Sequence, residues 1–596
     1  MHNITDRCLW VEGTCSTYII RAGDHSLLID CGMWAPAKLE QQADLGTVEQ
    51  VWLTHFHRDQ CGAAPAWSKA GSQLTFPFAE KRFFEEADLL RASYDIYDNY
   101  TSYFPGRGPL EDLRGEYACD YQHLQWRDLS AEIVPLPGHT FGSVGYLLEV
   151  DGQRLLACGD VLCGPGKLRE YFWAQWRYMD FQGHINLLES LQRLRQLEVD
   201  WLLPGHGAPF RARDEDLAKL LAALEELYEL FHGRPYQPYK PQFRRLSEHV
   251  HEVANSSANT YIVADGAGHG LLIDCGYTSN APISANPHRF IDHLTPHLQP
   301  ELGIDRVEWF LPSHYHDDHL AGLPCLQARY DTQVACSPEL TDIMQHPQRY
   351  DMPCAVPHSS RVDQVVPRDG VFHWRGLDFK IEQFPGQTLY HHLIGFAADG
   401  VKYLSIGDNI SGVSLTQGRD LVHSFIPKNR TPVSSYRDMP RQIAERAPDI
   451  LLTGHKGALS CKEDQVAAWQ GWMDRWAELF EDIIDQPVAD MGMDPHWVEF
   501  YPYKVRVQPG EEVIFEVRVT NHEKTASQCH LRFVGTVGLV LVPGEAELVV
   551  APGEVGTCQV RASIPKSLSS HSFTVVTDVT WNERRLGPIA EGVAYW

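Results

Sequence analysis

The sequence predicts an α/β fold that occurs twice in tandem and is followed by an all-β sandwich of immunoglobulin type. Three observations carry this prediction. Four blocks of sequence recur in the same order, each series of blocks is followed by an amphipathic helix, and the residues from about 498 onward have the pattern of short strands. A chain of 596 residues has room for three to four domains.

The duplication is visible as four pairs of matching segments. The pairs are LLIDCG at 27–32 and 271–276, VEQVWLTHFHRDQCGAAP at 48–65 and VEWFLPSHYHDDHLAGLP at 307–324, LACGDVL at 156–162 and LSIGDNI at 404–410, and VDWLLPGHGAP at 199–209 and PDILLTGHKGA at 448–458. Chance matches would not keep their order through four blocks. We therefore expect two copies of one domain of roughly 230 residues, called copy one and copy two below.

A helix is predicted after the last block of each copy. In copy one it begins near Asp214 and stops at Gly233, because its apolar residues recur at helical spacing and glycine favours a helix end. The predicted apolar faces are Leu217, Leu220, Leu221, Leu224, Leu227 and Phe231 in copy one, and Val466, Trp469, Met473, Trp476, Phe480 and Ile483 in copy two.

The domain boundaries follow from these helices and from composition. Three closely spaced prolines in GRPYQPYKPQFRR (233–245) predict a linker, and Pro487 closes copy two. After 498, alternating apolar residues and Pro-Gly turns predict short strands in a sandwich. The predicted ranges are 1–233 for domain 1, 234–248 for the linker, 249–486 for domain 2 and 498–596 for the β-sandwich.

Composition limits the class of protein. Hydrophobic residues make up 43% and charged residues 22%, as in ordinary globular domains. The formal net charge of −27 counts against a nucleic-acid partner, because phosphate binding needs basic patches. The 14 cysteines form no CxxC pair, and we see neither a signal peptide nor an apolar run long enough for a membrane. We therefore expect a cytoplasmic protein with reduced thiols and no membrane partner.

The polar residues of interest in copy one follow short apolar runs. His55 follows VWLT, His139 follows IVPLPG, Asp160 follows LLACG and His206 follows WLLPG. Such runs predict buried strands, and the glycines predict sharp turns at their ends. Because loops at one rim of a sheet commonly hold a site, we expect these four side chains to converge.

Converging histidines and aspartates are poor core residues but good metal ligands. Neutral imidazoles with carboxylates suit Zn²⁺ or Fe²⁺. An isolated histidine is more often structural. The ordered set HxHxD, GHT, GD and PGHG is more specific, and it predicts a metal site.

With these motifs, both copies resemble the metallo-β-lactamase superfamily over about residues 1–485. In that family HxHxDH, a later His, a bridging Asp and a final His form a two-metal site on an αββα sandwich, and most members are hydrolases. The resemblance implies a first metal at His55, His57 and His139 of copy one. It implies a second metal at Asp59 and His206, with Asp160 bridging. The matching residues of copy two are His314, His316, Asp318, His319, Asp408 and His455.

Each copy departs from the family pattern at one ligand. Gln60 replaces the last motif histidine in copy one, and Gln387 stands in copy two where copy one has His139. One interpretation is that each copy binds one metal tightly and a second weakly or not at all; the alternative is that one copy is a decayed scaffold. His391 or His392 is a candidate replacement ligand, with a supporting or surface role as the alternative.

The expected function is metal-dependent hydrolysis of an ester, lactone, thioester, amide or phosphoester of a small molecule. A bound metal lowers the pKa of its water to about 7, and Asp59 or Asp318 would orient that water and move its proton. The expected cofactor is Zn²⁺, one or two ions per domain, with Fe²⁺ or Mn²⁺ as alternatives. We expect copy one to carry the main reaction.

Two other functions remain open. Some relatives use one iron, held by two histidines and an aspartate, to oxidise sulfur compounds, and His55, His139 and Asp160 would suffice for that site. The chain could also be a non-catalytic binding or assembly protein with degenerate metal sites. In that case the β-sandwich would serve as a contact module, and it is also the candidate surface for a homo-oligomer.

Substrate contacts are predicted from the segments between ligand motifs. The stretches at 94–108 and 170–181 are rich in aromatic residues that could line a pocket or pack a helical subdomain. In copy two, Lys428 and Arg430 could hold an anionic group or lie on a solvated loop. The aromatic candidates are Tyr97, Tyr100, Trp173 and Tyr178.

Overall fold

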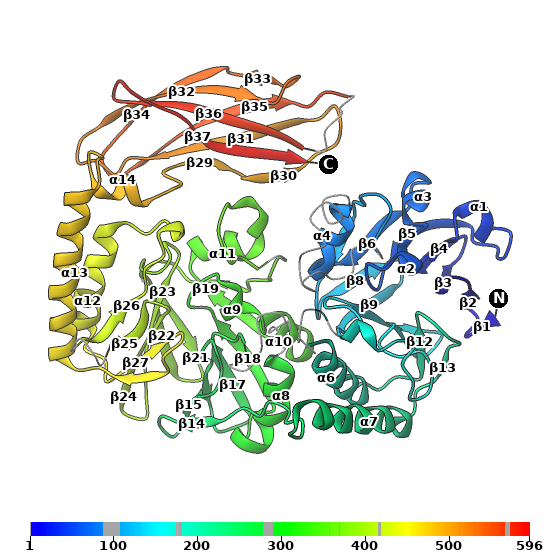
Figure 1. Cartoon of the computed structure of the whole chain (residues 1–596). Coiled ribbons are helices and arrows are strands. Elements are labelled where there is room, and N and C mark those ends of the chain that lie inside the picture. The colour runs from blue at the N-terminus through cyan, green and yellow to red at the C-terminus, as the bar shows by residue number, and fades with distance from the viewer. Residues whose placement is uncertain are drawn as a thin grey trace. The chain divides into compact units, whose positions relative to one another are not determined.

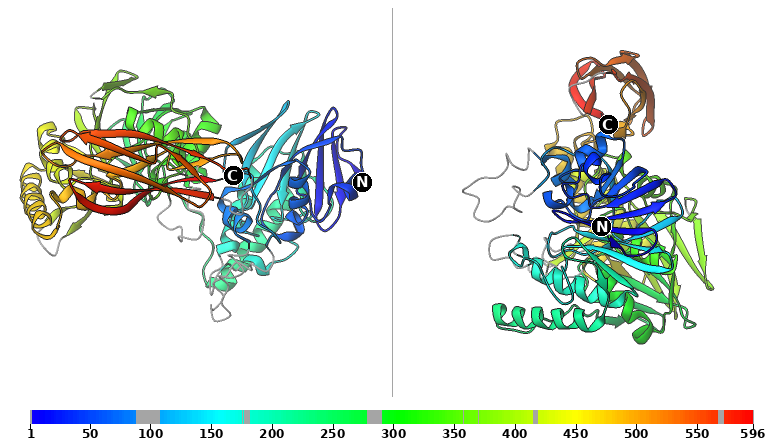
Figure 2. Two further views of the ribbon diagram at one scale, coloured as in Figure 1. Left: turned by 90° about the horizontal axis from the view of Figure 1, so that it is seen from above. Right: turned by 90° about the vertical axis from the view of Figure 1, so that its right-hand side faces the viewer.

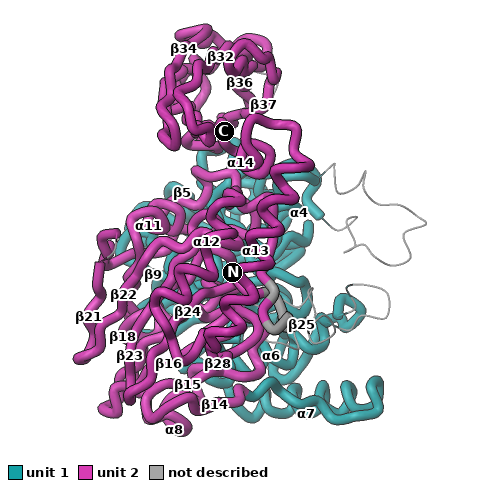
Figure 3. Tube along the Cα trace, turned by 90° about the vertical axis from the view of Figure 1, so that its left-hand side faces the viewer, with its two compact units in different colours: residues 1–240, 280–293 teal, residues 241–279, 294–596 magenta. Residues whose placement is uncertain are grey.

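The computed structural model describes residues 2–87, 108–174, 176, 182–277, 290–356, 358–368, 370–414, 419–566 and 572–595. The chain divides into two compact units (Figure 3). Unit 1 comprises residues 1–240 and 280–293, and unit 2 comprises residues 241–279 and 294–596. Copy one lies in unit 1, whereas unit 2 holds most of copy two and the C-terminal all-β domain. None of the helices described is both long and apolar enough to cross a membrane.

Copy one contains two sheets. The first has seven strands in chain order, and the second has six in the order β13-β12-β11-β10-β9-β8 (Figure 1). The strands of the first sheet are β1 (His2–Asn3), β2 (Cys8–Glu12), β3 (Ser16–Ala22), β4 (His25–Ile29), β5 (Thr47–Trp52), β6 (Gln73–Pro77) and β7 (Glu116–Ala118). Those of the second are β8 (His123–Trp126), β9 (Leu129–Pro135), β10 (Val144–Val150), β11 (Gln153–Gly159), β12 (Trp201–Pro204) and β13 (Phe210–Arg211).

Helices cover both outer faces of copy one. The helices are α1 (Pro36–Leu39), α2 (Arg58–Cys61), α3 (Ala64–Lys69), α4 (Lys81–Glu85), α6 (Gln182–Gln196) and α7 (Asp214–His232), with short turns η1 (Phe78–Glu80) and η3 (Phe172–Ala174). Apolar residues of α1 to α4 form one core with the first sheet, and those of α6 and α7 form another with the second. A third core lies between the sheets. These layers confirm the predicted αββα arrangement.

Copy two repeats this plan in unit 2. Its first sheet runs from β14 to β20 in chain order, and its second has the order β21-β22-β23-β24-β27-β28. The strands are β14 (Phe243–Arg245), β15 (Val250–Val253), β16 (Tyr261–Ala264), β17 (His269–Ile273), β18 (Arg306–Leu311), β19 (Gln333–Cys336), β20 (Gln364–Val365), β21 (Gly370–Trp374), β22 (Leu377–Gln383), β23 (His392–Ala398), β24 (Val401–Gly407), β27 (Ile450–Thr453) and β28 (Ala458–Ser460), plus a hairpin of β25 (Ile410–Ser414) and β26 (Arg419–His423).

The helices of copy two follow the same order. They are α8 (Phe290–Leu302), α9 (Asp317–Leu320), α10 (Leu323–Tyr330), α11 (Pro338–Gln345), α12 (Val433–Arg446) and α13 (Glu463–Ile483), with short turns η5 (Pro347–Arg349) and η6 (Pro427–Asn429). Apolar residues of α12 and α13 pack on the second sheet. Strand β14 pairs with β15, so the sheet of copy two begins inside the range that we predicted to be a linker.

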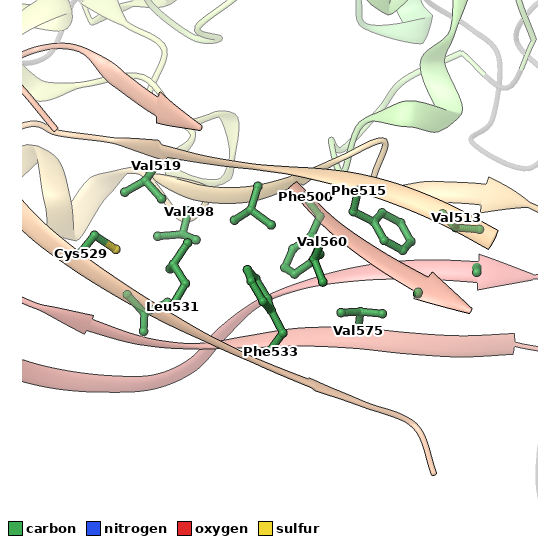
Figure 4. Close-up of a cluster of buried hydrophobic side chains, with 14 of the residues drawn as sticks. Val498, Phe500, Val513, Phe515, Val519, Cys529, Leu531, Phe533, Val560 and Val575 are labelled. Atoms are coloured by element: carbon green, nitrogen blue, oxygen red, sulfur yellow. The ribbon is translucent and has the colours of Figure 1, made fainter. Parts of the chain in front are cut away.

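The C-terminal domain is built from two sheets, as predicted. One has the order β29-β31-β35-β33 and the other β30-β37-β36-β32-β34. Figure 2 shows this part of the chain in orange and red. The elements are α14 (Ala489–Met493), β29 (Val498–Tyr501), β30 (Lys504–Arg506), β31 (Glu512–Thr520), β32 (Ser527–Gly535), β33 (Val540–Val542), β34 (Glu545–Val550), β35 (Val555–Ser563), β36 (Ser572–Trp581) and β37 (Arg584–Tyr595). Alternate residues of β31, such as Phe515, point into the core between the sheets (Figure 4).

Candidate metal centres

The candidate ligands of copy one follow the strands that the sequence predicted. His55 and His57 come after β5, His139 after β9, Asp160 directly after β11, and His206 after β12. Strands β11 and β12 are parallel neighbours, so Asp160 and His206 leave the sheet at the same edge. Gly205 permits this approach, because a Cβ there would lie 2.5 Å from Asp160 Oδ1.

Three buried histidines form a cluster in copy one. One ring nitrogen each from His55, His57 and His139 can be chosen so that all lie within 4.8 Å of one another. In one pair, His57 Nδ1 lies 3.0 Å from His139 Nε2. Burial lowers the pKa of His55 to about 3, so its imidazole is neutral at pH 7. A neutral imidazole is the form that binds a metal.

A second group lies beside this cluster. His206 Nδ1 is 2.8 Å from Asp160 Oδ1, and its Nε2 is 3.3 Å from Asp59 Oδ2. Burial alone would lower the pKa of His206, but hydrogen bonds with Asp160 and Asp59 outweigh it and raise that pKa to about 10. The Gln60 amide nitrogen donates to Asp160 Oδ2 at 3.3 Å.

In copy two, the most complete group of candidate ligands is the one that corresponds to the second group of copy one. Asp318, His319, Asp408 and His455 each place one ligand atom within 4.8 Å of the others. His319 Nε2 is 3.1 Å from Asp408 Oδ1, and His455 Nε2 lies 3.2 Å from Asp408 Oδ2 and 3.3 Å from Asp318 Oδ2. His455 Nδ1 is 2.6 Å from the carbonyl oxygen of Ser257, which orients its ring.

The position that matches the histidine cluster of copy one is altered in copy two. His314, His316 and Asp408 converge there, and the Gln387 amide nitrogen donates to Asp408 Oδ2 at 2.9 Å. Among the described residues, His314 Nε2, His316 Nε2 and Gln387 Oε1 are buried without a hydrogen-bond partner. Buried polar atoms normally have partners, so these atoms fit a site for a cation or its water.

His392 is engaged away from this position, whereas His391 lies against it. His391 Nε2 accepts a hydrogen bond from the Asp408 backbone N–H at 3.1 Å, and its ring stacks on that of His314. His392 Nε2 is 2.6 Å from Ser337 Oγ. The structure therefore favours a supporting role for His392, whereas His391, whose Nδ1 is buried without a hydrogen-bond partner among the described residues, stays a candidate replacement ligand.

Sequence reasoning missed two aspartates that orient the candidate ligands. Asp30 accepts hydrogen bonds from the Thr54 N–H and Oγ–H, both at 2.8 Å, directly before His55. Asp274 accepts the corresponding bonds from Ser313, at 2.7 and 2.6 Å, and also lies 2.9 Å from His319 Nδ1. The repeated LLIDCG block contains both aspartates and was the available signal.

Glu80 was also missed, and it connects two ligand loops of copy one. Its fully buried carboxylate accepts the backbone N–H of Phe56 at 2.8 Å and that of Gly142 at 3.1 Å. Phe56 lies between His55 and His57 in the sequence. Glu80 therefore holds the first motif next to the loop that follows His139.

Only part of the predicted substrate pocket belongs to the described residues. Trp173 is buried, with its ring 4.1 Å from that of His57, so it contributes to the wall of the site. Tyr97, Tyr100 and Tyr178 lie outside the described residues. Arg169, which the sequence did not single out, places Nη1 3.6 Å from Asp59 Oδ2 with 40% of its side chain exposed.

The two candidate anion-binding residues of copy two, Lys428 and Arg430, lie in different environments. Lys428 is exposed, in agreement with a solvated loop. Arg430 is buried against Asp494 and Glu499, so both predictions for this residue, an anion-binding group and a solvated side chain, were wrong. The acidic partners come from the C-terminal part of the chain, which local sequence does not reveal.

Comparisons with known proteins agree with this geometry. The sequence model of the metallo-beta-lactamase superfamily matches residues 10–206 and again residues 254–455. A hydroxyacylglutathione hydrolase from Aeromonas salmonicida is 29% identical over 202 residues, which are 33% of this chain and 60% of that protein. An atrochrysone carboxyl ACP thioesterase from Aspergillus fumigatus is 26% identical over 206 residues, 34% of this chain and 39% of that protein.

A solved structure of a metallo-beta-lactamase family protein from Thermus thermophilus is 18% identical, with a TM-score of 0.33, and the match covers 39% of this chain and 83% of that one. This chain spans three fifths or less of the length of the two relatives named above. The superfamily match, in contrast, extends over most of both copies. The chain belongs to the metallo-β-lactamase superfamily, with one family domain in each of its two copies.

Proposed function

We propose that this chain is a metal-dependent hydrolase of acyl thioesters and that copy one carries the main reaction. The observation that carries the proposal is the buried cluster of His55, His57 and His139. Relatives named as a hydroxyacylglutathione hydrolase and an ACP thioesterase support acyl hydrolysis as the reaction class. Esters, lactones, amides and phosphoesters are the competing substrates.

The donor set of copy one suits Zn²⁺. Three neutral imidazoles and one open position are the ligand arrangement of many catalytic zinc sites. When bound, the metal supplies a water with a pKa of about 7 and polarises the substrate carbonyl. Asp59 is ionised at neutral pH: burial raises its pKa, but the hydrogen bond with His206 and the charge of that imidazole help to lower it overall. Its Oδ2 orients the attacking water and holds the released proton.

Each copy holds one metal ion tightly in this proposal. In copy one, Gln60 presents an amide N–H to Asp160 Oδ2, and in copy two Gln387 does the same to Asp408 Oδ2. A donor N–H on this oxygen would compete with a second cation for the carboxylate. Copy two then binds its ion through Asp318, His319, Asp408 and His455, and two carboxylates make this set suitable for Mn²⁺ or Fe²⁺ as well as Zn²⁺.

Arg169 gives copy one a preference for acidic substrates. Its half-exposed guanidinium lies next to Asp59, and it offers several N–H donors to a carboxylate or phosphate. Replacing Arg169 with Met should therefore raise KM for an acidic thioester more than KM for a neutral one. Equal effects on both substrates would remove Arg169 from substrate binding.

The test is an activity screen of the full chain with added Zn²⁺ against matched thioesters, esters, lactones and phosphodiesters. Products are measured by chromatography, because the exposed Cys354 would react with thiol reagents. We expect the parent chain to hydrolyse thioesters. The His55→Ala variant should lose this activity, and the His455→Ala variant should keep it. The opposite pattern would make copy two the enzyme, and turnover of phosphodiesters alone would refute the substrate class.

One observation keeps the iron-dependent oxidation of sulfur compounds as a second candidate. His55 Nε2 and His139 Nε2 lie 3.8 and 3.4 Å from Asp160 Oδ2, so two histidines and one aspartate adjoin in copy one. Iron found by metal analysis of the purified protein, together with oxygen consumption in the presence of a thiol, would favour this function. Zinc with no oxygen consumption would favour the hydrolase.

A further inference from the structure

We propose that Arg430 is a positioning residue through which the C-terminal all-β domain supports the proposed metal centre of copy two, formed by Asp318, His319, Asp408 and His455. Arg430 follows the short turn η6, and only 5% of its side chain is exposed. It has a left-handed backbone conformation, with a φ of 70°. A non-glycine residue keeps this conformation where its surroundings hold it in place. The inference rests on the metal centre proposed above for copy two.

One side of Arg430 contacts the C-terminal part of the chain. Nη1 donates to Glu499 Oε2 at 2.6 Å, Nη2 to the carbonyl oxygen of His496 at 2.9 Å, and Nε to Asp494 Oδ1 at 3.3 Å. Glu499 belongs to β29, the first strand of the all-β domain. Asp494 is in turn 3.0 Å from His522 Nε2, so the guanidinium sits in a network of buried polar groups.

The other side of the same turn contacts the ligand loops. The carbonyl oxygen of Asn429 accepts the Leu389 N–H at 3.1 Å, and its side-chain oxygen lies 3.5 Å from Tyr315 Oη. Arg430 Nη1 is 3.4 Å from Tyr390 Oη. Tyr315 lies between His314 and His316 in the sequence, and Leu389 follows Gln387 by two residues. The turn therefore touches the motif that also carries Asp318 and His319, two ligands of the proposed centre, and the segment that carries Gln387.

A second connection joins the same domain to the loop beside the site. The Tyr503 N–H donates to the carbonyl oxygen of Arg349 at 2.7 Å, and Tyr501 Oη donates to Asp342 Oδ2 at 2.6 Å. Farther along this loop, the carbonyl oxygen of Cys354 accepts the Asp317 N–H at 2.8 Å. Asp317 directly precedes Asp318. The all-β domain is thus a structural support of copy two's centre, and Arg430 is its most buried link.

The test measures metal affinity at copy two alone. In a chain carrying His55→Ala and His57→Ala, Zn²⁺ binding is titrated in competition with a chromophoric chelator. Arg430→Met should weaken Zn²⁺ binding by about 10- to 100-fold, the range typical of losing a group that orients metal ligands. Arg430→Lys should recover part of the affinity. Lys428→Met, which removes an exposed charge from the same turn, should leave it unchanged.

A purely structural role for Arg430 gives a different result. It would lower the melting temperature of Arg430→Met but leave its Zn²⁺ affinity equal to that of the parent, and this outcome would overturn the proposal. If Arg430→Met does not fold, Glu499→Gln keeps the shape of the partner and should weaken binding in the same direction; unchanged affinity there also refutes it. A parent that binds no Zn²⁺ at copy two would refute the metal centre itself, together with this inference.

Discussion

At the scale of single residues, the two copies differ most at their glutamines. Gln60 and Gln387 stand at different points of the ligand pattern, yet each directs its amide nitrogen at Oδ2 of the aspartate that the family resemblance predicts to bridge two metals. In both side chains the amide oxygen is buried without a hydrogen-bond partner among the described residues. A neutral N–H donor thus satisfies a carboxylate that a cation would otherwise neutralise.

Restoring histidine should add a metal ion to each copy. Gln60→His places an imidazole beside Asp160 and His206, and Gln387→His does so beside His314 and His316. Each variant should hold one more Zn²⁺ than the parent in elemental analysis at the same free Zn²⁺ concentration, because imidazole is a far better ligand than a neutral amide.

The matched control for this prediction is Gln60→Met, which keeps the length of the side chain but offers no nitrogen donor. Its zinc content should equal that of the parent. Unchanged zinc content in both histidine variants would show that the glutamines do not limit metal binding.

At the scale of elements, the helices show how far periodicity predicts burial. Helix α7 ends at Gly233 with a φ of 65°, as expected, and it buries Leu217, Leu220, Leu221 and Leu224. Phe231, predicted on the same face, is 51% exposed, and Ile483 of α13 is 71% exposed. The buried stripe of α7 ends at Tyr228, one turn before the helix itself ends. Periodicity therefore predicts the face of a helix better than the length over which that face is covered.

Two tryptophans of α13 test this difference. Trp469 is 2% exposed and belongs to the same buried cluster as Leu451, Ile443 and Met473, whereas Trp472 is 45% exposed on the same helix. Trp469→Ala should reduce the free energy of unfolding of copy two by about 3–5 kcal/mol, because a large buried side chain is lost. Trp472→Ala should change it by no more than about 0.5 kcal/mol.

The measurement is urea unfolding of both variants, followed by circular dichroism. Equal destabilisation by the two substitutions would contradict the burial of Trp469 and the exposure of Trp472. Because the chain has several domains, the comparison uses the transition assigned to copy two by its sensitivity to Trp469→Ala.

At the scale of the whole molecule, the net charge bears on whether the chain can bind nucleic acid. The 78 acidic residues outnumber the 51 basic ones, giving a formal net charge of −27. Phosphate backbones repel such a chain unless basic side chains gather locally. We therefore predict no measurable binding of a labelled DNA duplex or single strand at physiological salt in fluorescence anisotropy. Tight binding that weakens steeply with added salt would refute this prediction and reopen nuclease-type chemistry.

The sequence alone determined the order of domains and most candidate ligands. The repeated blocks predicted two αββα domains, and alternation after residue 498 predicted the all-β domain. The ligand motifs could be predicted because each is short and directly follows its own strand. Each motif can therefore be recognised from a few consecutive residues. The immunoglobulin type of the sandwich and the pocket role of Tyr97, Tyr100 and Tyr178 stay predictions.

Only the tertiary structure decided which distant groups support the ligands. Asp30 orients Thr54, Glu80 joins the loops at Phe56 and Gly142, and Arg430 pairs with Glu499. These partners lie on different elements, and nothing in the sequence around Arg430 indicates that acidic residues from another domain will bury it. Hydrogen bonds and ion pairs of this kind depend on distances in space, which chain folding sets and sequence spacing does not reveal.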